Sequence, residues 1–416
     1  MTNEAQTAAV IPAGSKCPAL KAAWERYLAT LEEMRVKIES SPQFDAAPRQ
    51  RAKAYHILME AQAVVYNHAL APRMSHPRLF HNIDWQTDVY AMSGAGPDFF
   101  YGTVFLDGAQ TYRISGHVRD SRLLLAQMNK ALPGSPGSKL LANYDFASFK
   151  IRDDGTFDII VSAQKHEGNW IAMDPGPDVQ WLLFRPLVES WDARPTELTI
   201  ERISPIEPNH YDADEFDEEV TARRIDAAAG YVRYMIQAWT IGFSQHCQRN
   251  AGGINVFKSI GTEISGEVGS PSAEYVMMVY EVSDDEALIL EIDQEPTGLF
   301  WSYQVYDLWL RSLDFQNRQT TLHSKQIAKD SDGGIRLVLS RQDPGLANWL
   351  DTAGRDKGQI LLRDYCSKKS TVPRVHRVNF AELDRHLPRD SKRVSAEDRT
   401  AELGRRRACY RRRYGE

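Results

Sequence analysis

Cysteine is scarce in this sequence, with only four residues, Cys17, Cys247, Cys366 and Cys409, in a chain of 416. No two of them are close enough in sequence for a zinc knuckle or a redox motif, so both of these are excluded. Scattered cysteines are typical of free thiols in a reducing compartment, and we therefore expect a cytoplasmic protein.

Long apolar runs are missing too. No stretch approaches 18 uncharged apolar residues, and the first residues lack the basic start and apolar run of a signal peptide. The net charge of −6 disfavours a nucleic-acid binder, which needs excess Lys and Arg to neutralise phosphates. We therefore expect neither a membrane nor a nucleic acid as a partner.

Nucleotide and hydrolase motifs are also absent. Gly252-Gly253 stands alone, and Gly94-Ala95-Gly96 runs into Pro97 with no helix expected after it. Neither is a dinucleotide fingerprint, and no Gly-x-Ser-x-Gly elbow is present. This pattern disfavours a kinase, a Rossmann dehydrogenase and an α/β hydrolase, and we expect no cofactor and no metal.

What the sequence does contain is many short strands bounded by Gly, Pro and Asp, a pattern typical of a sandwich or barrel. In the first half we expect strands at Asp88–Met92, Gly102–Leu106, Thr111–Gly116, Asp145–Ile151, Phe157–Ala163, Gln180–Pro186 and Leu198–Ile203. In the second half we expect them at Tyr275–Val282, Ala287–Ile292, Trp301–Asp307, Ile335–Ser340 and Ile360–Tyr365.

Helical spacing appears in four places. One helix should bury Leu20, Trp24, Leu28 and Leu31, and a second follows Pro48. A long helix should run from the acidic stretch Asp212–Glu219 to about Cys247, and a last one should follow Ser395.

The expected fold is therefore mainly β with α additions: two jelly-roll-like β-sandwiches, N-terminal helices, a long connecting helix and a C-terminal helix. The expected division is a disordered start (1–15), a helical region (16–72), a first β domain (73–210), an acidic linker with the long helix (211–250), a C-terminal sandwich (251–366) and a polar tail with an Arg-rich helix (367–416).

Three stretches carry a resemblance to a known bacterial family. They are Gly96–Tyr101 with Asp107-Gly108 and Thr111–Gly116; Gly168–Pro175 with Arg185 and Arg194–Arg202; and Trp301–Tyr303 with Trp309, Ser312–Asp314 and Arg341–Gly354. In these stretches the sequence resembles the family called domain of unknown function 1214. The resemblance implies a jelly-roll-like C-terminal sandwich and a second β domain before it. It implies no reaction and no catalytic residues.

The densest polar stretch contains Arg341, Asp343, Asn348 and Asp351, which we expect on one loop between two strands. Asp351 or Asp343 would serve as general acid or base, Asn348 would hydrogen-bond a ligand, and Arg341 would hold an anion. The alternative is structural, because Asn and Asp also form turns by bonding nearby backbone.

Two further groups suggest ligand binding. Tyr101, Arg113 and His117, expected on adjacent strands, would bind a carboxylate or sulfate; the alternative is a solvent-facing strand with a cross-strand pair. Trp301 and Tyr303 alternate along one strand and would line an apolar pocket, or else form sandwich core. His76, His81 and Asp84 match no standard metal site.

Two functions follow from these residues. The first is a cofactor-independent isomerase, hydratase or hydrolase acting on a small apolar metabolite with an acidic or polar group. The second is a non-catalytic ligand-binding or self-assembly module, with a homodimer as the expected state because sandwich edges must be covered.

The tail holds six arginines in residues 405–413. We expect this helix to pack on the protein, or on a partner subunit, near Asp212–Glu219 through Leu403, Tyr410 and Tyr414, and not to bind nucleic acid or membrane. A frayed, solvated end is the alternative.

Overall fold

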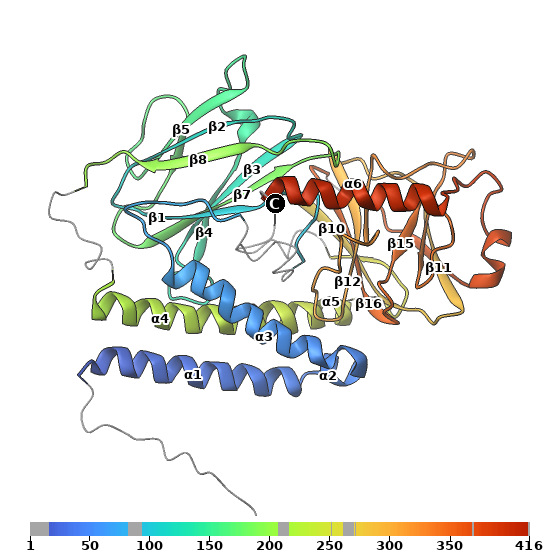
Figure 1. Cartoon of the computed structure of the whole chain (residues 1–416), viewed down its shortest axis with the longest axis horizontal. Helices are drawn as coiled ribbons and strands as arrows, with labels where there is room; N and C mark the ends of the chain where they lie inside the picture. Colours follow the sequence, from blue (N-terminus) through green and yellow to red (C-terminus); the bar gives the residue numbers. More distant parts are fainter. Residues whose placement is uncertain are drawn as a thin grey trace, which may run out of the picture.

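The computed structural model describes residues 16–81, 94–206, 216–250, 252–260, 270, 272–367 and 370–414, apart from the side chains of Cys247 and Tyr414. Two β-sandwiches lie beside each other, with most of the helices along one side of them and α6 across the opposite side (Figure 1). The predicted fold class is confirmed. The strand predicted at Asp88–Met92 lies outside the described residues.

The first sandwich packs two four-stranded sheets, β1-β7-β3-β4 and β6-β5-β2-β8. Its strands are β1 (Gly102–Asp107), β2 (Tyr112–His117), β3 (Leu123–Lys130), β4 (Lys139–Asp145), β5 (Thr156–Ser162), β6 (Trp170–Ala172), β7 (Val179–Leu187) and β8 (Glu197–Arg202). Side chains such as Val104, Ile114, Ile159 and Leu182 meet between the sheets, because alternate residues of each strand point inward.

The second sandwich packs the sheet β13-β12-β16-β10-β9 on the sheet β15-β14-β11-β17. Its strands are β9 (Lys258–Ser259), β10 (Ala273–Glu281), β11 (Glu286–Ile292), β12 (Phe300–Tyr306), β13 (Thr321–His323), β14 (Ile335–Ser340), β15 (Trp349–Asp351), β16 (Lys357–Tyr365) and β17 (Arg374–Asn379). Val276, Leu288, Leu337 and Leu362 lie in its interior.

The helices lie mainly beneath the sandwiches in the view of Figure 1. They are α1 (Pro18–Glu39), α2 (Pro42–Ala46), α3 (Arg51–Val65), α4 (Glu218–Arg233), α5 (Ser244–Asn250) and α6 (Ala396–Tyr414). Short 3₁₀ segments are η1 (Pro48–Gln50), η3 (Phe146–Ser148) and η6 (Phe380–Arg385), and π-helical segments are η2 (Tyr66–Leu70) and η5 (Tyr234–Phe243). None of the helices in the described part of the chain has both the length and the apolar character needed to cross a membrane.

A third core lies between the sandwiches. Phe105 and Leu183 of the first sandwich, Met277 and Leu361 of the second, and Val232 of α4 belong to one apolar cluster. The inner strands of the two facing sheets, such as β7 and β12, are therefore buried on both faces over most of their length. Most polar residues within these strands are buried as well.

Three predictions of local structure are wrong. Asp145–Ile151 is the end of β4 followed by a 3₁₀ turn, because Asp145 accepts a hydrogen bond from the backbone of Ala147. Trp24 and Leu28 are half-exposed, since the buried side of α1 is formed by Ala23, Thr30, Met34 and Ile38. β17, in the stretch assigned to the polar tail, is an edge strand whose exposed polar residues hide its alternation.

Candidate functional site

Asp351, the predicted general base, lies in a strand and not in a loop. Trp349–Asp351 pairs in parallel with β14, so the expectation of one continuous loop after Ser340 is wrong. The Asp351 side chain is 3% exposed, and its carboxylate accepts hydrogen bonds from Arg318 Nη1 (2.9 Å) and the Ala353 amide (2.7 Å). Both oxygens are therefore occupied in holding a turn.

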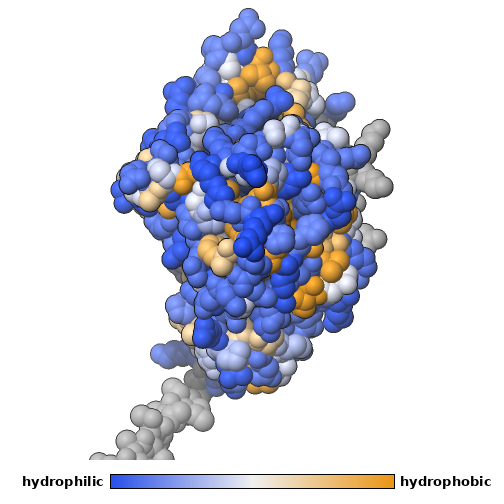
Figure 2. All heavy atoms as spheres, turned by 90° about the vertical axis from the view of Figure 1, so that its right-hand side faces the viewer, coloured by the Kyte–Doolittle hydropathy of each residue, from blue (hydrophilic) through white to orange (hydrophobic). Residues whose placement is uncertain are grey.

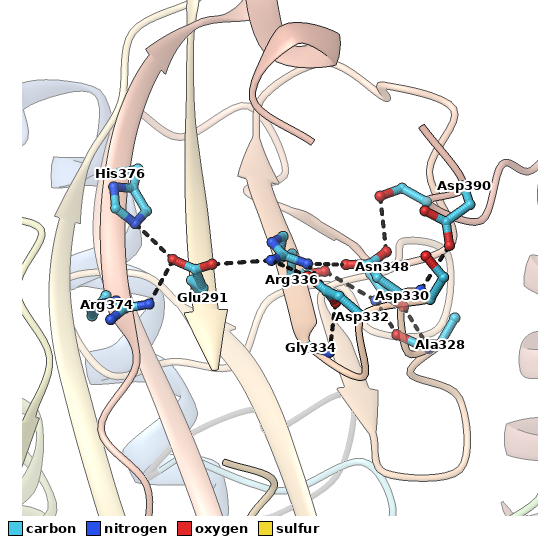
Figure 3. Close-up of polar contacts among 12 residues, drawn as sticks. Glu291, Ala328, Asp330, Asp332, Gly334, Arg336, Asn348, Arg374, His376 and Asp390 are labelled. Atoms are coloured by element: carbon cyan, nitrogen blue, oxygen red, sulfur yellow. Dashed lines mark hydrogen bonds and ion pairs between the residues drawn. The ribbon is translucent and has the colours of Figure 1, made fainter. Parts of the chain in front are cut away.

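Asn348 is fully used by the backbone around it. Its Oδ1 accepts from the Ala328 amide (2.8 Å), while Nδ2 donates to the carbonyls of Ala328 (2.7 Å) and Arg336 (3.0 Å). Figure 3 shows the side chain beside the ion pairs of Arg336. These contacts fix Asn348 as a link between β14 and the preceding loop.

Asp343 and Arg341 bond different neighbours. Asp343 accepts from the Gly345 amide (2.8 Å) and pairs with Arg399 of α6 (3.0 Å). Arg341 pairs with Asp284 (2.8 Å). The four polar residues predicted as a single centre thus each serve a separate local contact.

Trp301 and Tyr303 form sandwich core. Both are buried among the apolar side chains of the second sandwich, with ring centroids 6.2 Å apart in an edge-to-face arrangement. Burial raises the pKa of the Tyr303 hydroxyl well above its usual value.

Tyr101, Arg113 and His117 do not come together. Arg113 and His117 lie on β2, where Arg113 donates to Glu201 (2.8 Å) and His117 Nδ1 accepts from the Arg119 amide (2.9 Å). Tyr101 directly precedes β1, in the opposite sheet, and is buried. The prediction that they lie on adjacent strands is wrong, because similar strand patterns do not reveal which sheet each strand joins.

The histidines near residue 80 also have separate partners. His81 stacks on Phe100 with centroids 4.5 Å apart and its Nδ1 lies 2.9 Å from the Tyr101 carbonyl, while His76 bonds Ser75. In the described stretches of the chain, no three His, Cys, Asp or Glu side chains are placed to hold a metal. Asp84 lies outside these stretches.

A different group of polar residues lies between the two sandwiches. The second sandwich contributes side chains from the outward face of its inner sheet, where Arg363 of β16 is flanked by Tyr275 of β10 and Ser302 of β12. Tyr365 follows on the same face, because residues two apart in a strand point the same way. All of these side chains are buried.

The first sandwich contributes a matching set. Arg185 of β7 is 3% exposed and donates to Gln127 of β3 (2.6 Å). Gly102 pairs with Phe184, so Tyr101 lies next to Arg185 when the register is continued by one residue. We call the whole set the inter-sandwich cluster: Tyr101, Gln127, Arg185, Tyr275, Gln304, Tyr306, Arg363 and Tyr365. Of the nine predicted site residues, only Tyr101 belongs to it.

Arg363 is the most informative member of the inter-sandwich cluster. It is 6% exposed, and it donates to Gln304 Oε1 (2.9 Å) and to the Gly94 carbonyl, with its guanidinium 5.5 Å from the centre of the Tyr306 ring. Each of these partners is neutral. Within the described ranges, no carboxylate forms an ion pair with Arg363.

Two tyrosines of the inter-sandwich cluster, Tyr101 and Tyr365, are held in the protonated form. Burial raises the pKa of Tyr101 and Tyr365 above the usual value, and the guanidinia of Arg363 and Arg185 only partly offset this rise. At neutral pH these hydroxyls are therefore hydrogen-bond donors, close to two cations. Such a set favours an anion with oxygen acceptors.

Two signals in the sequence point to this cluster. β10 contains an unbroken apolar run from Tyr275 to Tyr280, and β16 contains Ile360-Leu361-Leu362, which predicts burial on both faces there. An Arg at position 363 or 185 of such a strand must then be buried, which is rare without a partner. In the sequence, Arg185 stands out only as part of the stretch that resembles the family, and no motif marks Arg363.

A large cavity lies elsewhere. It has a volume of about 770 Å³ and lies between α4, η2 and the rim of the first sandwich, with Leu132, Val179 and Ala227 in its wall. Lys130 and Asp178, which also line it, bond each other (3.1 Å).

The chain is thus a protein of two β-sandwiches with a buried polar cluster between them. Residues 281–369, from the end of β10 to just after β16, match the family described as "Protein of unknown function (DUF1214)". This match confirms, over that range, the resemblance predicted from the sequence.

Solved structures support the fold. The crystal structure of an uncharacterised protein from Burkholderia cenocepacia is similar with a TM-score of 0.75 and 23% identity, covering 88% of this chain and 100% of that one. The VPA0106 protein from Vibrio parahaemolyticus has a TM-score of 0.45 and 12% identity, covering 78% and 98%, which is too distant for any argument. No curated protein matches the sequence.

Proposed function

We propose that the chain binds a small organic acid between its two sandwiches, with the acid's carboxylate on Arg363. The observation that carries the proposal is the charge of Arg363, which is buried among neutral partners. Burying an uncompensated charge costs several kcal/mol, a cost that an anion bound beside it would offset. A guanidinium can bond both oxygens of a carboxylate at once.

The surroundings of Arg363 favour an acid with an apolar, preferably aromatic, body. Phe99, Phe300 and Tyr365 pack against one another, with centroid distances from 5.0 to 6.3 Å. Aromatic rings next to one cation match a ligand with one charged end and one apolar end.

We propose binding and not proton-transfer catalysis at this cluster. The raised pKa of Tyr101 and Tyr365 keeps both hydroxyls protonated at neutral pH, so they donate hydrogen bonds and do not abstract protons. The carboxylates first considered as bases are engaged elsewhere, Asp351 with Arg318 and Asp343 with Arg399.

The experiment is a calorimetric and thermal-shift comparison of acids with their uncharged amides: benzoate, phenylacetate and hexanoate against benzamide, phenylacetamide and hexanamide. We expect at least one acid to raise the melting temperature and its amide to have no effect. Arg363→Gln should weaken binding of that acid by about tenfold or more, the value of a charged hydrogen bond.

Arg113→Gln is the matched control. Arg113 is also an arginine in a strand, but it is exposed and paired with Glu201. Its loss should leave acid binding unchanged. Equal binding of acid and amide, or unchanged binding by the Arg363→Gln protein, would overturn the proposal.

A cytoplasmic location and a homodimer are further proposals. Cys17, Cys366 and Cys409, the cysteines whose side chains are described, form no disulfide with one another, which favours a reducing compartment. The face over the second sandwich is largely hydrophilic with small separate apolar patches, so it does not favour self-association there (Figure 2). Light scattering of the purified protein measures the oligomeric state.

A further inference from the structure

The segment Gly94–Tyr101 connects the two sandwiches at the inter-sandwich cluster. Its start is bonded to the second sandwich: Gly94 donates its amide to the Leu310 carbonyl (3.1 Å) and accepts from Arg363, and the Ala95 carbonyl accepts from Gln304 (2.7 Å). We call residues 94–101 the bridging segment.

The end of the bridging segment is bonded to the first sandwich. Val188 donates to the Asp98 carbonyl (3.1 Å), and Phe100 donates to the Pro186 carbonyl (2.9 Å). The Tyr101 hydroxyl accepts from the Gly96 amide (3.2 Å), which closes the segment on itself. A shift of the bridging segment would therefore move partners of both Arg363 and Tyr101.

The middle of the bridging segment is held by the Arg-rich helix α6. The Pro97 carbonyl accepts two hydrogen bonds, one from the Tyr410 hydroxyl and one from Arg413 Nη1 (2.8 Å). Tyr410 is 1% exposed and Arg413 is 7% exposed. Both acceptor positions of this buried carbonyl are thus used by one turn of α6.

The rest of α6 is bonded mainly to the second sandwich. Arg399 donates to the Leu346 carbonyl, and Arg406 donates to the carbonyls of Phe315 (3.2 Å) and Arg318 (3.1 Å). Near its end Arg412 donates to the Trp191 carbonyl, in the loop after β7. α6 therefore contacts both sandwiches, and Figure 1 shows it running along the second sandwich with its C-terminal end where the two meet.

This arrangement corrects the prediction for the tail. The arginines of α6 pair with Asp343 and with backbone carbonyls. At the start of α4, Glu218 bonds Cys17 and Glu219 pairs with Arg223, so the described end of the acidic stretch does not hold α6. Asp212 and Tyr414 lie outside the described contacts.

We propose that Tyr410 and Arg413 are positioning residues for the acid-binding site, acting through Pro97 on the bridging segment. The proposal rests on the function proposed above, because it names how that site is kept in shape. Loss of either donor leaves the Pro97 carbonyl with one hydrogen bond in place of two, loosens residues 94–101 and weakens the fixed geometry of the Gly94 carbonyl around Arg363. Binding should weaken although neither residue belongs to the inter-sandwich cluster.

The experiment uses the full chain and two measurements. The first is hydrogen–deuterium exchange of residues 94–101 without ligand, with β14 as an internal reference. The second is calorimetry with the acid that binds the wild-type protein. The variants are Tyr410→Phe, Arg413→Gln and Arg413→Lys, with Arg411→Gln as the control because Arg411 lies in the same turn and is exposed.

We expect Tyr410→Phe and Arg413→Gln to speed exchange of residues 94–101 by about fivefold, the effect of one net hydrogen bond, and to leave β14 unchanged. Affinity for the acid should fall by a similar factor. Arg413→Lys should restore much of both, since lysine also donates to a carbonyl. Arg411→Gln should change neither.

Each other outcome is decisive. Unchanged exchange at residues 94–101 would overturn the positioning role, as would faster exchange with wild-type affinity. Equal acceleration at β14 would show general destabilisation and would also overturn it. Faster exchange confined to residues 94–101, in a protein whose wild-type form binds no acid, would overturn the proposed function and leave the hold of α6 on Pro97 supported.

Discussion

Arg336 and Arg363 lie in opposite sheets of the same sandwich and have opposite surroundings. Arg336 on β14 pairs with Asp330 (2.8 Å), Asp332 (2.8 Å) and Glu291 (3.2 Å), and Glu291 in turn pairs with neighbouring residues of β17 (Figure 3). Arg363 on β16 bonds neutral groups. Both guanidinia are largely shielded from water, but the protein neutralises only the first.

This difference indicates that Arg336 stabilises the fold, whereas Arg363 keeps a charge that can bind a ligand. The carboxylates around Arg336 already occupy its donors, so nothing remains for a ligand. Arg363 is held in place by a side-chain amide, a carbonyl and an aromatic ring, which orient a guanidinium without cancelling its charge. The two arginines should therefore respond differently to the same substitution.

The largest effect is expected for Arg336→Met. This change leaves Asp330, whose side chain is 6% exposed, without its cation and removes one of the cations that pair with Glu291, so the free energy of unfolding should fall by about 3 kcal/mol. Urea denaturation followed by circular dichroism measures the change. Arg385→Met, at an exposed pair with Glu382, is the control and should cost less than about 1 kcal/mol.

A smaller loss is expected for Asp351→Ala. The substitution removes the acceptor for the Ala353 amide and for Arg318, which should cost about 2 kcal/mol. Acid binding at Arg363 should stay at the wild-type level, measured by calorimetry at a temperature where the variant is folded. A large loss of acid binding with little loss of stability would contradict the structural role of Asp351 and would support a functional one.

Arg363→Met should change stability by no more than about 1 kcal/mol in either direction. Losing the bonds to Gln304 and Gly94 is offset by removing a buried, uncompensated charge. The same urea experiment applies, run without ligand. A fall in the free energy of unfolding as large as that of Arg336→Met would mean that the protein itself neutralises Arg363. The contrast between the two arginines would then be wrong.

The pH dependence of stability separates two groups of the second sandwich, His323 and Glu291. Burial lowers the pKa of His323, so the folded protein keeps it neutral while the unfolded chain takes up a proton below about pH 6.5. The stability that comes from a neutral His323 is thus complete above that pH and is lost as the pH falls below it. His323→Gln should flatten the stability curve between about pH 7 and pH 5.

Glu291 acts in a more acidic range. Burial alone would raise its pKa, but hydrogen bonds from His376 and Arg374 outweigh burial and lower it. The stability it contributes is present above the unfolded pKa of about 4.3 and is lost as the pH falls through the lower folded value. Glu291→Gln should flatten the curve below about pH 4.3 only, and identical curves for the three proteins would contradict both assignments.

The positions of the strands could be predicted from the sequence, but the hydrogen-bond and ion-pair partners of the polar side chains could not. The expected bounds of β10, β12 and β16 lie within three residues of the observed ones, because apolar and aromatic side chains fill the middle of each strand. The role of Asn348 was missed because its acceptor, Ala328, lies 20 residues earlier, and no local pattern reveals that contact. Asp351 was misread for the same reason, since Arg318 is 33 residues away.

The inter-sandwich cluster was almost invisible because it combines two sandwiches. Tyr101 was predicted to lie beside Arg113 and His117. In the structure its neighbours are Arg185 and Arg363, which lie in strands that were predicted only from their apolar residues. Helix α6 was expected from Ser395 and its acidic first turn. Its buried arginines were not, because a run of six cations normally indicates a solvated face.

The hold of α6 on Pro97 also sets the order in which the molecule is completed. Its two donors follow their acceptor by 313 and 316 positions, so during synthesis the first sandwich emerges long before this contact can form, and the strands of the second also precede α6. Such a distant closure is made late and slowly, because the ends of a long loop must first meet. The nascent chain therefore passes through a stage in which both sandwiches are folded but the site between them is incomplete. In that stage, acid binding requires α6 to dock first.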